Sequence, residues 1–568
     1  MTWAAMGMDG PIDVFFSTGE KSGDVLAAPV YRELLRLRAD GVRAAGLAGV
    51  HCTQVGVENI FDRPDLATVE FSVATYDDWD AIYRYLLRDL KERPARVFVG
   101  VTHHMFNLAL APELPEQTCR MLVGPPEIWG WRLNWLGMGL ANLFRPLTWV
   151  RLFEDSGRRA LRRVYVVARS MCTVADRGKL PLKHFDKVVC LTPLNYDTYG
   201  RARERMGRGI VRGQASESRL QDSDGGATRG ADERATRIEP SLRTARGCHP
   251  GGQDARAARD AACMHGQDAR ATGDAACGHG QDARAAGDAA YMHGQDARAT
   301  GAEVVFAGHS AALLRRDGYM PRVEAFRRRH GMADGAHILT ILPGSRPGSV
   351  RRVLPTIMEA AVEILNRYPG LHCLVSAADE TVVPYIESRL ADVRKRITRP
   401  QRVGVCREDT RLLLCAGSHA ILSSGTVTLE AACLGARGTV VYDLGWLTKL
   451  LFAVFCRRMR FGPEKYLAPF ALPNALYAWL GRPKEQWPYD EFTLKKRYFN
   501  AGNIVRSVAG SLDAIPSEYD VEAPPTLAGE MIETIRKAFT PPGGDCHRFI
   551  AEHIAAAIDG IMSQDTPS

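Results

Sequence analysis

The sequence predicts an α/β protein with two doubly wound parallel-sheet domains that face a cleft. Short apolar segments typical of buried strands alternate with longer amphipathic segments, first before residue 211 and again after residue 303. The length of 568 residues also exceeds that of one typical domain. Two such series in one long chain therefore predict two separate α/β cores.

The first series begins with a buried strand over residues 13–16, a loop over 17–24 and a helix over 25–38. Its later strands are predicted at 42–47, 97–101, 119–123 and 187–191. Because these strands alternate with helical segments, we assign residues 10–211 to an N-terminal domain with a parallel sheet. Residues 133–176 interrupt it with apolar runs and arginines, which predict either a membrane-interfacial segment or a pair of core or lid helices.

The second series predicts a C-terminal domain over residues 303–500. Its strands are expected at 338–342, 372–376, 404–406, 420–422 and 439–442. Residues 501–568 are expected to form C-terminal helices that pack partly on the N-terminal domain.

A low-complexity segment over residues 212–302 separates the two series. It repeats Gly-Gln-Asp-Ala-Arg-Ala every 14 residues, with the glutamines in register at Gln253, Gln267, Gln281 and Gln295. This period is too short and the composition too polar for a solenoid that buries a core. The segment is therefore predicted to be a disordered insertion.

The charge balance and the cysteine pattern limit the classes of function. The net charge of +8 suits an anionic membrane surface or phosphorylated substrates, and no arginine-aromatic pattern typical of a nucleic-acid reader accompanies it. The 13 cysteines contain no Cys-x-x-Cys pair, which favours reduced thiols in a cytoplasmic setting. The N-terminus lacks the features of a signal peptide, and no apolar run reaches the roughly 18 residues that span a bilayer. We expect a soluble or peripheral membrane protein.

Two strand-loop-helix junctions in the C-terminal half are the strongest pointers to a ligand. Each places small residues and hydroxyls where a strand ends and a helix begins, so that backbone N–H groups and the positive end of a helix dipole meet. The junction residues are Gly344, Ser345 and Arg346 in the first loop, and Ser423, Ser424, Gly425 and Thr426 in the second. Arg346 can contact a diphosphate, and Glu430 can accept hydrogen bonds from a ribose. The alternative interpretation is that these residues only form turns and cap the helices that follow, without binding a ligand.

Further motifs, in order along the chain, resemble those of the lipid-A-disaccharide synthase family of Gram-negative bacteria. They are Gly19-Glu-Lys-Ser-Gly-Asp24, Gly124-Pro-Pro-Glu-Ile-Trp-Gly-Trp-Arg132, Val305-Phe-Ala-Gly-His309, Leu342-Pro-Gly-Ser-Arg346, Ser424-Gly-Thr426 through Glu430, and Leu472-Pro-Asn474. The resemblance implies a GT-B fold of two Rossmann-like domains. It also implies inverting transfer of 2,3-diacylglucosamine from its UDP derivative to 2,3-diacylglucosamine 1-phosphate, with release of UDP.

The same resemblance implies where the protein acts and which residues bind its substrates. The expected location is the cytoplasmic face of the inner membrane, with peripheral attachment. Asn474 joins the donor-binding residues named above. The expected acceptor-binding residues are Ser22, Gly23, Asn107, Trp129 and Arg132. No Asp-x-Asp pair lies near the donor junctions, so neither a metal nor another cofactor is expected.

The general base is the point at which this sequence departs from the family. Thr102 and Met105 replace two acidic positions after the fourth strand. His103 and His104 lie in the same loop, and histidine is a competent base near neutral pH. Glu20 and Asp24 are acidic alternatives, although Asp24 equally suits a cap that closes its turn.

The loss of both acidic positions leaves two other functions open. A non-catalytic homologue that binds UDP-sugar or lipid would tolerate that loss. A UDP-hexosamine enzyme with a different acceptor would keep the donor junctions and change the acceptor side. Retention of the diphosphate junctions favours an enzyme, because a scaffold has no need of them.

Overall fold

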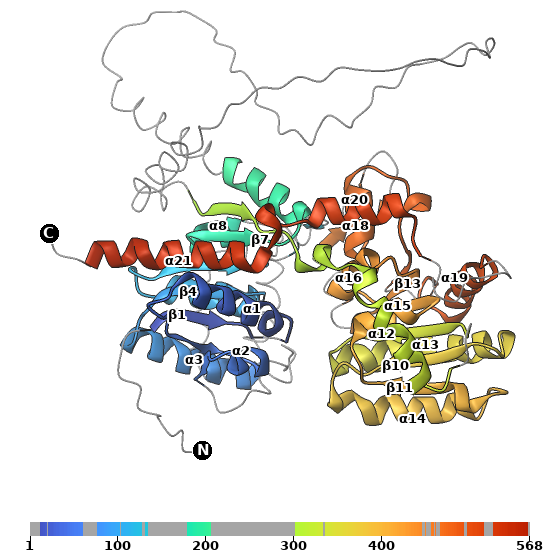
Figure 1. The fold of residues 1–568 in the computed structure, drawn as a ribbon. Helices are drawn as coiled ribbons and strands as arrows, with labels where there is room; N and C mark the ends of the chain where they lie inside the picture. The colour runs from blue at the N-terminus through green and yellow to red at the C-terminus, as the bar shows by residue number, and fades with distance from the viewer. Residues whose placement is uncertain are drawn as a thin grey trace, which may run out of the picture. The chain divides into compact units, whose positions relative to one another are not determined.

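The structure is a computed structural model that describes residues 12–19, 21–60, 76–102, 104–125, 127, 131–133, 179–205, 301–332, 336–445, 449, 456–458, 460–461, 466–467, 469–493, 497–515 and 526–565. The predictions for Glu20, His103, Trp129 and the insertion at 212–300 lie outside these residues. The interrupting segment over 134–176 does so as well. Two parallel sheets carry the fold (Figure 1), which confirms the predicted class of two doubly wound domains.

The first sheet has seven parallel strands in the order β3-β2-β1-β4-β5-β7-β8. The strands are β1 (Ile12–Ser17), β2 (Ala44–Leu47), β3 (Glu58–Asn59), β4 (Ala95–Val101), β5 (Cys119–Val123), β7 (Lys187–Cys190) and β8 (Glu303–Phe306). Central β1 is buried along its length, and Phe15 pairs with Ala45 on one side and Phe98 on the other. Burial on both faces explains the apolar run Val14-Phe15-Phe16 at the centre of this strand.

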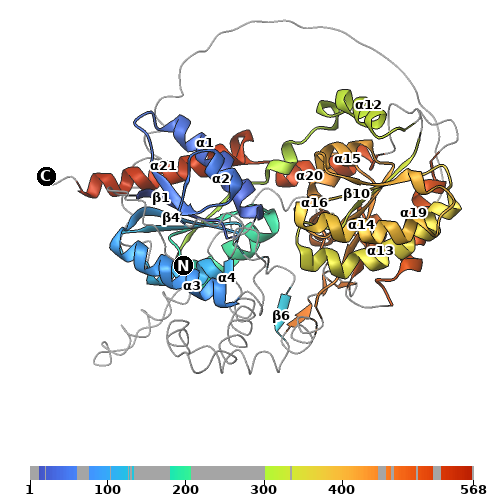
Figure 2. The same ribbon diagram turned by 90° about the horizontal axis from the view of Figure 1, so that it is seen from below.

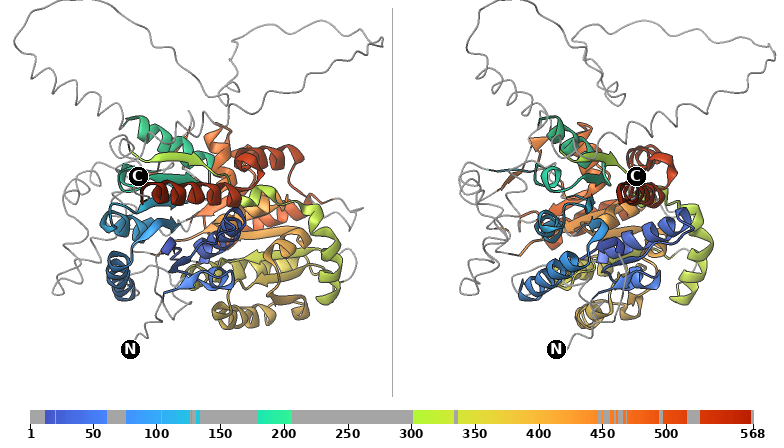
Figure 3. Two further views of the ribbon diagram at one scale, coloured as in Figure 1. Left: turned by 60° about the vertical axis from the view of Figure 1, so that its left-hand side comes forward. Right: turned by 90° about the vertical axis from the view of Figure 1, so that its left-hand side faces the viewer.

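Helices cover both faces of the first sheet, because successive strand residues point to opposite faces. Val14 and Phe16 pack on one side with α1 (Lys21–Leu37), α2 (Val50–Gln54) and α21 (Cys546–Asp565). Phe15 and Phe98 pack on the other with α3 (Tyr76–Glu92), α4 (His104–Leu110) and α8 (Lys179–His184). The C-terminal helix α21 lies along α1 (Figure 1, Figure 3).

The second sheet has six parallel strands in the order β11-β10-β9-β12-β13-β17. The strands are β9 (Ile338–Leu342), β10 (His372–Ser376), β11 (Val403–Cys406), β12 (His419–Ser423), β13 (Gly438–Tyr442) and β17 (Asp490–Thr493). One face packs on α13 (Pro347–Arg367), α14 (Val383–Arg394) and α19 (Ala501–Asp513). The other packs on α12 (Met320–Arg329), α15 (Thr410–Ala416), α16 (Thr426–Cys433), α18 (Leu472–Trp479) and α20 (Gly529–Phe539). Figure 2 separates the two layers, with α12 and α15 on one side and α13 and α14 on the other.

Short elements complete the described structure. The strand β6 (Trp131–Leu133) pairs antiparallel with β14 (Cys456–Arg458), and β15 (Arg460–Phe461) pairs with β16 (Tyr466–Leu467). Among the described helices, none has the length and apolar character that crossing a bilayer requires.

Two expected boundaries differ from the structure. Residues 303–306 form edge strand β8 of the first sheet, so the second domain begins after Phe306 and not at residue 303. The pairing of β8 with β7 satisfies backbone groups that a free edge would expose. Helix α1 begins at Lys21, four residues before its predicted start, because Gly23 lets its first turn approach the carbonyl oxygen of Thr18.

The chain crosses between the sheets at two connections that touch. The amide of His309 donates to the carbonyl oxygen of Phe539 at 2.9 Å. Gly308 has a φ of 71°, and a Cβ at this position would lie 2.5 Å from Cα of Pro541. The contact therefore requires glycine at residue 308.

Candidate functional site

The two donor junctions lie side by side at the switch point of the second sheet. Strand β9 is first in the chain, and later strands extend the sheet in both directions from it, through β10 on one side and β12 on the other. Ligands of doubly wound folds bind at the carboxyl ends of the strands where this reversal occurs. Leu342 pairs with Leu422, and a Cβ on Gly344 would lie 3.5 Å from Oγ of Ser423.

Glycine shapes both of these loops. Gly344 has a φ of 106° and Gly425 a φ of 152°, conformations that residues with a side chain rarely adopt. Gly425 is also the N-cap of α16, so the first amides of this helix follow it directly. Ser345, Arg346 and Thr426 are at least partly exposed beside these amides. Both loops thus place backbone amides at the start of a helix, and helix N-termini favour anions.

Ser424 fixes the second loop through hydrogen bonds to two neighbouring segments. Its Oγ donates to the carbonyl oxygen of Phe470 at 3.0 Å, and its amide donates to the carbonyl oxygen of Val441 at 3.2 Å. Both donors are therefore occupied by the scaffold, and Thr426 is the accessible hydroxyl at the start of α16. Ser423 ends β12 and is 4% exposed.

Asn474 also belongs to the scaffold of this site. The side chain is fully buried, its Oδ1 accepts from the amide of Tyr489 at 3.1 Å, and its Nδ2 donates to the Tyr489 carbonyl at 3.0 Å. Nδ2 also donates to Glu491 at 3.1 Å, and Glu491 accepts from the amides of Phe470 and Ala471. This geometry lets Asn474 fix the segment that holds Ser424, a role different from the direct donor contact expected from the sequence. No motif identifies Glu491, which follows Asp490 in β17.

Glu430 lies in α16 four residues after Thr426 and forms an ion pair with Arg411. Nη2 of Arg411 lies 2.9 Å from Oε1 of Glu430, and Nε lies 3.3 Å from the same oxygen. Burial lowers the pKa of Arg411, but the Glu430 carboxylate and the Tyr319 hydroxyl raise it above its ordinary value. Arg411 therefore stays charged. Nothing in the sequence marks this arginine, because it lies on α15, 19 residues before its partner.

Three of the expected acceptor-side residues, Ser22, Gly23 and Asn107, lie at the switch point of the first sheet. Strands β1 and β4 are neighbours there, and the chain reverses its direction of growth between them. A Cβ on Gly23 would lie 2.6 Å from the Thr18 carbonyl oxygen and 2.9 Å from Oγ1 of Thr102. Ser22 is exposed next to this contact. Glycine at position 23 thus allows α1 to start against the ends of both strands.

Two polar side chains at this edge are bound to the scaffold. Asp24 is 2% exposed and accepts from the amides of Gly49, His51 and Cys52 at 2.8 to 3.0 Å. These bonds satisfy the first amides of α2, which favours the capping role over the role of general base. Asn107 is fully buried and accepts from Oγ of Ser17 at 2.6 Å. Its amide therefore secures the end of β1.

The segment that carries the histidine candidates begins in an unusual conformation. Thr102 has a φ of 55°, which a β-branched residue rarely adopts and which costs about 1–3 kcal/mol. Such conformations cluster at functional sites. No sequence motif predicts this backbone conformation at Thr102. His104 is the first residue of α4, and Arg132 lies in β6 opposite Arg457; the side chains of His104 and Arg132 lie outside the described part.

A cluster at the start of α21 has the composition of a metal site. Asp545, Cys546 and His547 place one ligand atom each within 4.8 Å of one another. Asp545 already accepts from the amide of His547 at 2.8 Å, as a helix cap does. Burial raises the pKa of the Cys546 thiol to about 12, which disfavours the thiolate that binds metals. The helix end accounts for this cluster without an ion.

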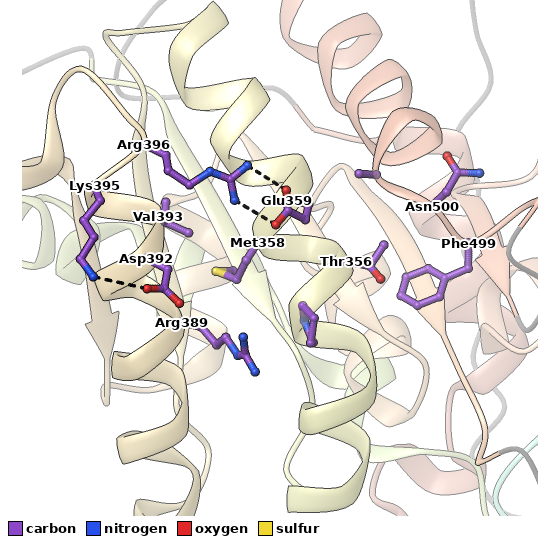
Figure 4. A pocket seen from close by; sticks show the side chains of 12 residues that line it. Thr356, Met358, Glu359, Arg389, Asp392, Val393, Lys395, Arg396, Phe499 and Asn500 are labelled. Atoms are coloured by element: carbon purple, nitrogen blue, oxygen red, sulfur yellow. Dashed lines mark hydrogen bonds and ion pairs between the residues drawn. The ribbon is translucent and has the colours of Figure 1, made fainter.

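A groove on the outer face of the second domain lies between α13, α14 and α19 (Figure 4). Four of its charged side chains form two ion pairs, Arg396 with Glu359 and Lys395 with Asp392, and a fifth, Arg389, lies over the ring of Tyr385. None of the junction residues lines it. The groove is therefore separate from the candidate donor site.

Two doubly wound domains with loops gathered at the switch point of each sheet define the class of the protein as a nucleotide-binding α/β fold of the GT-B type. The sequence profile of lipid-A-disaccharide synthetase matches residues 14–141 and 298–457, just over half of the chain. The chain belongs to the lipid-A-disaccharide synthase family. This membership confirms the resemblance inferred from the motifs.

Individual relatives match shorter stretches. The lipid-A-disaccharide synthase of Rhodospirillum centenum is 34% identical over 135 residues, which are 24% of this chain and 32% of the relative. That of Myxococcus xanthus is 26% identical over 213 residues, 34% of this chain and 53% of the relative. The chain thus spans about a third to a half of the length of these relatives. A solved UDP-GlcNAc 2-epimerase from Neisseria meningitidis bound to UDP-GlcNAc is 11% identical, with a TM-score of 0.44 and coverage of 96% of this chain and 100% of that chain.

Proposed function

We propose that this protein is a lipid-A-disaccharide synthase that transfers 2,3-diacylglucosamine from its UDP derivative to 2,3-diacylglucosamine 1-phosphate and releases UDP. The observation that carries the proposal is the adjacency of the loops after β9 and β12 at the switch point of the second sheet. Membership of the family supplies the reaction.

In the proposed donor site, the diphosphate binds at the N-terminus of α16. The amides that follow Gly425, the Thr426 hydroxyl and the Arg346 guanidinium stabilise the negative charge that develops on UDP as the bond to the sugar breaks. Glu430 accepts hydrogen bonds from the ribose. In this proposal, protein groups alone supply the electrostatic stabilisation of the departing UDP.

On the acceptor side, a hydroxyl oxygen attacks the anomeric carbon from the face opposite UDP, which inverts the configuration. The new C–O bond forms as the bond to the UDP phosphate breaks, and the hydroxyl proton passes to a general base. We assign this base to His103 or His104, with Glu20 as the acidic alternative. The bound geometry of Asp24 supports its exclusion from this role. Ser22, Gly23, Trp129 and Arg132 are assigned to the acceptor.

The acylated substrates imply the place of action. Lipid-linked donor and acceptor reside in or at a membrane, so the proposed location is the cytoplasmic face of the inner membrane with peripheral attachment. The segment over 133–176, apolar with interspersed arginines, is the proposed site of that attachment.

The decisive test is UDP release by the purified protein supplied with UDP-2,3-diacylglucosamine in detergent, with and without 2,3-diacylglucosamine 1-phosphate. We expect acceptor-dependent release. A His103→Ala/His104→Ala variant should lose roughly a hundredfold or more in rate. Equal release from both proteins would reassign the base to Glu20. Binding of UDP without release would contradict the proposed transfer and favour the binding homologue or a different acceptor.

A further inference from the structure

The ion pair between Arg411 and Glu430 has an asymmetric geometry. Nη2 and Nε of Arg411, at 2.9 and 3.3 Å, both approach Oε1 of Glu430. The described residues donate no hydrogen bond to the other carboxylate oxygen, Oε2. The side chain of Glu430 is 21% exposed. One oxygen is thus held by the arginine, while the other remains available to a ligand.

A second pair in the same domain has a different geometry. Arg396 contacts Glu359 through two parallel bonds of 2.9 Å, one from Nη1 to Oε1 and one from Nη2 to Oε2 (Figure 4). Such a bidentate pair occupies both carboxylate oxygens, so neither oxygen is left for a ligand. The pair at Glu430 lacks this bidentate geometry and lies near the exposed start of α16. The bidentate pair of Arg396 and Glu359 lines the outer groove instead.

The position of Glu430 on α16 suits a group attached to a phosphate at the helix start. Thr426 and Glu430 are four residues apart and therefore lie on the same face of the helix, about 6 Å apart along its axis. A pyrophosphate at the N-terminus would place its ribose one turn further along. Vicinal hydroxyls on that ribose are the donors that a carboxylate oxygen accepts.

We propose that Arg411 is a positioning residue that holds Glu430 with Oε2 directed to the ribose hydroxyls, so that the site selects ribonucleotides over deoxyribonucleotides. The inference rests on the proposed donor site. Arg411 does not touch the ligand. It acts by fixing the rotamer of Glu430 through Oε1 and by leaving Oε2 open. Arg411 is itself held by Asp409, which accepts from its amide at 2.9 Å and starts α15.

The test compares calorimetric affinities for UDP and 2′-deoxy-UDP across purified full-length variants. The wild-type protein should bind UDP roughly tenfold more tightly. Arg411→Ala should reduce this ratio to about twofold, and Arg411→Lys should give an intermediate value because a point charge replaces the fork. Glu430→Gln should also reduce the ratio. Arg396→Ala is the matched control and should leave it unchanged.

The outcomes separate this inference from the proposed function. An unchanged ratio in Arg411→Ala and Arg411→Lys, with UDP still bound, would overturn the inference and leave the donor site intact. Equal weakening of both ligands would also overturn it, since that pattern indicates a phosphate contact. Failure of the wild-type protein to bind UDP would overturn the donor site and the inference together. If Arg411→Ala does not fold, as judged from its melting curve, Arg411→Lys carries the decision.

Discussion

Polar side chains at the carboxyl edges of the two sheets fall into two groups that differ in burial and in hydrogen bonding. Asp24, Asn107 and Asn474 are buried with their polar atoms bonded to backbone or to neighbouring side chains. Arg346 and Thr426 are accessible at the start of helices. Because breaking the hydrogen bonds of a buried group costs its desolvation free energy, the first group serves the scaffold, and only the second is assigned to the ligand in the proposed donor site.

Arg346→Ala should weaken UDP binding by about 2–3 kcal/mol, because a charge-assisted contact to the diphosphate is lost. Isothermal titration calorimetry gives the affinity directly. Arg367→Ala is the control, since Arg367 ends the same helix, α13, and pairs with Asp513 on the surface. Unchanged affinity in Arg346→Ala would contradict the assignment of this arginine to the donor.

His419 should make the free energy of unfolding depend on pH. The side chain is 3% exposed, and burial, assisted by Arg437, lowers its pKa to about 3. The unfolded chain binds this proton near pH 6.5, so its contribution to stability is complete above that pH and falls as the pH drops toward 3. From pH 7 to 5 we expect a loss of about 2 kcal/mol from this residue alone.

Urea unfolding of wild type and His419→Gln at pH 7 and pH 5 checks this expectation. The variant should lose less stability than wild type between the two values. The exposed residue His51 provides the control substitution, His51→Gln. Identical pH dependence in all three proteins would show that His419 is not the source.

At the scale of single elements, α16 depends on the residue that precedes it. Gly425 has a φ of 152° and a ψ of −167°, and no atom lies within 4 Å of a Cβ built there. The requirement for glycine is therefore one of backbone conformation and not of space. The direction in which the first amides of α16 point follows from this single residue.

Gly425→Ala should cost about 1–3 kcal/mol of stability and weaken UDP binding, because the added Cβ disfavours the conformation that aims these amides. Thermal unfolding and calorimetry measure the two effects. Gly529→Ala, at the start of α20, also meets no atom within 4 Å and lacks a positive φ. That control should alter neither quantity, and wild-type affinity in the Gly425→Ala variant would remove α16 from the donor site.

At the scale of the whole molecule, the first sheet is completed by residues from distant parts of the chain. Its edge strand β8 follows the insertion, and its covering helix α21 ends the described chain. Ile550, Ile554 and Ile558 of α21 are buried with Val14 and Phe16 of β1. The first domain therefore cannot form its full core from residues 10–211 alone.

Deletion of residues 212–300 should leave the fold intact, because a repeat of such polar, low-complexity composition can bury almost no apolar surface. A short glycine-serine linker would join the ends. The deletion must stop there, since the amide of Ala302 donates to the Leu182 carbonyl at 3.0 Å and its side chain is buried. We expect the melting temperature to change by less than about 2 °C.

A longer deletion, through residue 306, also removes β8 and is compared with the deletion of residues 212–300. That protein should melt at least about 5 °C lower, because β7 loses β8, one of its two partner strands. Differential scanning calorimetry of both proteins tests the prediction. A large loss of stability on removal of 212–300 alone would assign the insertion a structural role.

Local patterns predicted much of the fold. The strands at 119–123 and 338–342 have the predicted bounds, because most of their residues are apolar and buried. The start of α1 and the membership of β8 were predicted wrongly. The first depends on the close approach of Gly23 to Thr18, and the second on pairing across a long insertion.

The family, the two-domain α/β class and the positions of the two strand-loop-helix junctions could be predicted from the amino-acid sequence, because each depends on the spacing and chemistry of contiguous residues. Folding determined which of the named polar residues are bound to the scaffold. In the folded chain Asp24 and Asn474 accept hydrogen bonds from backbone amides, and Arg411 pairs with Glu430. Those outcomes depend on hydrogen-bond partners far away in the chain, which only the tertiary structure brings together.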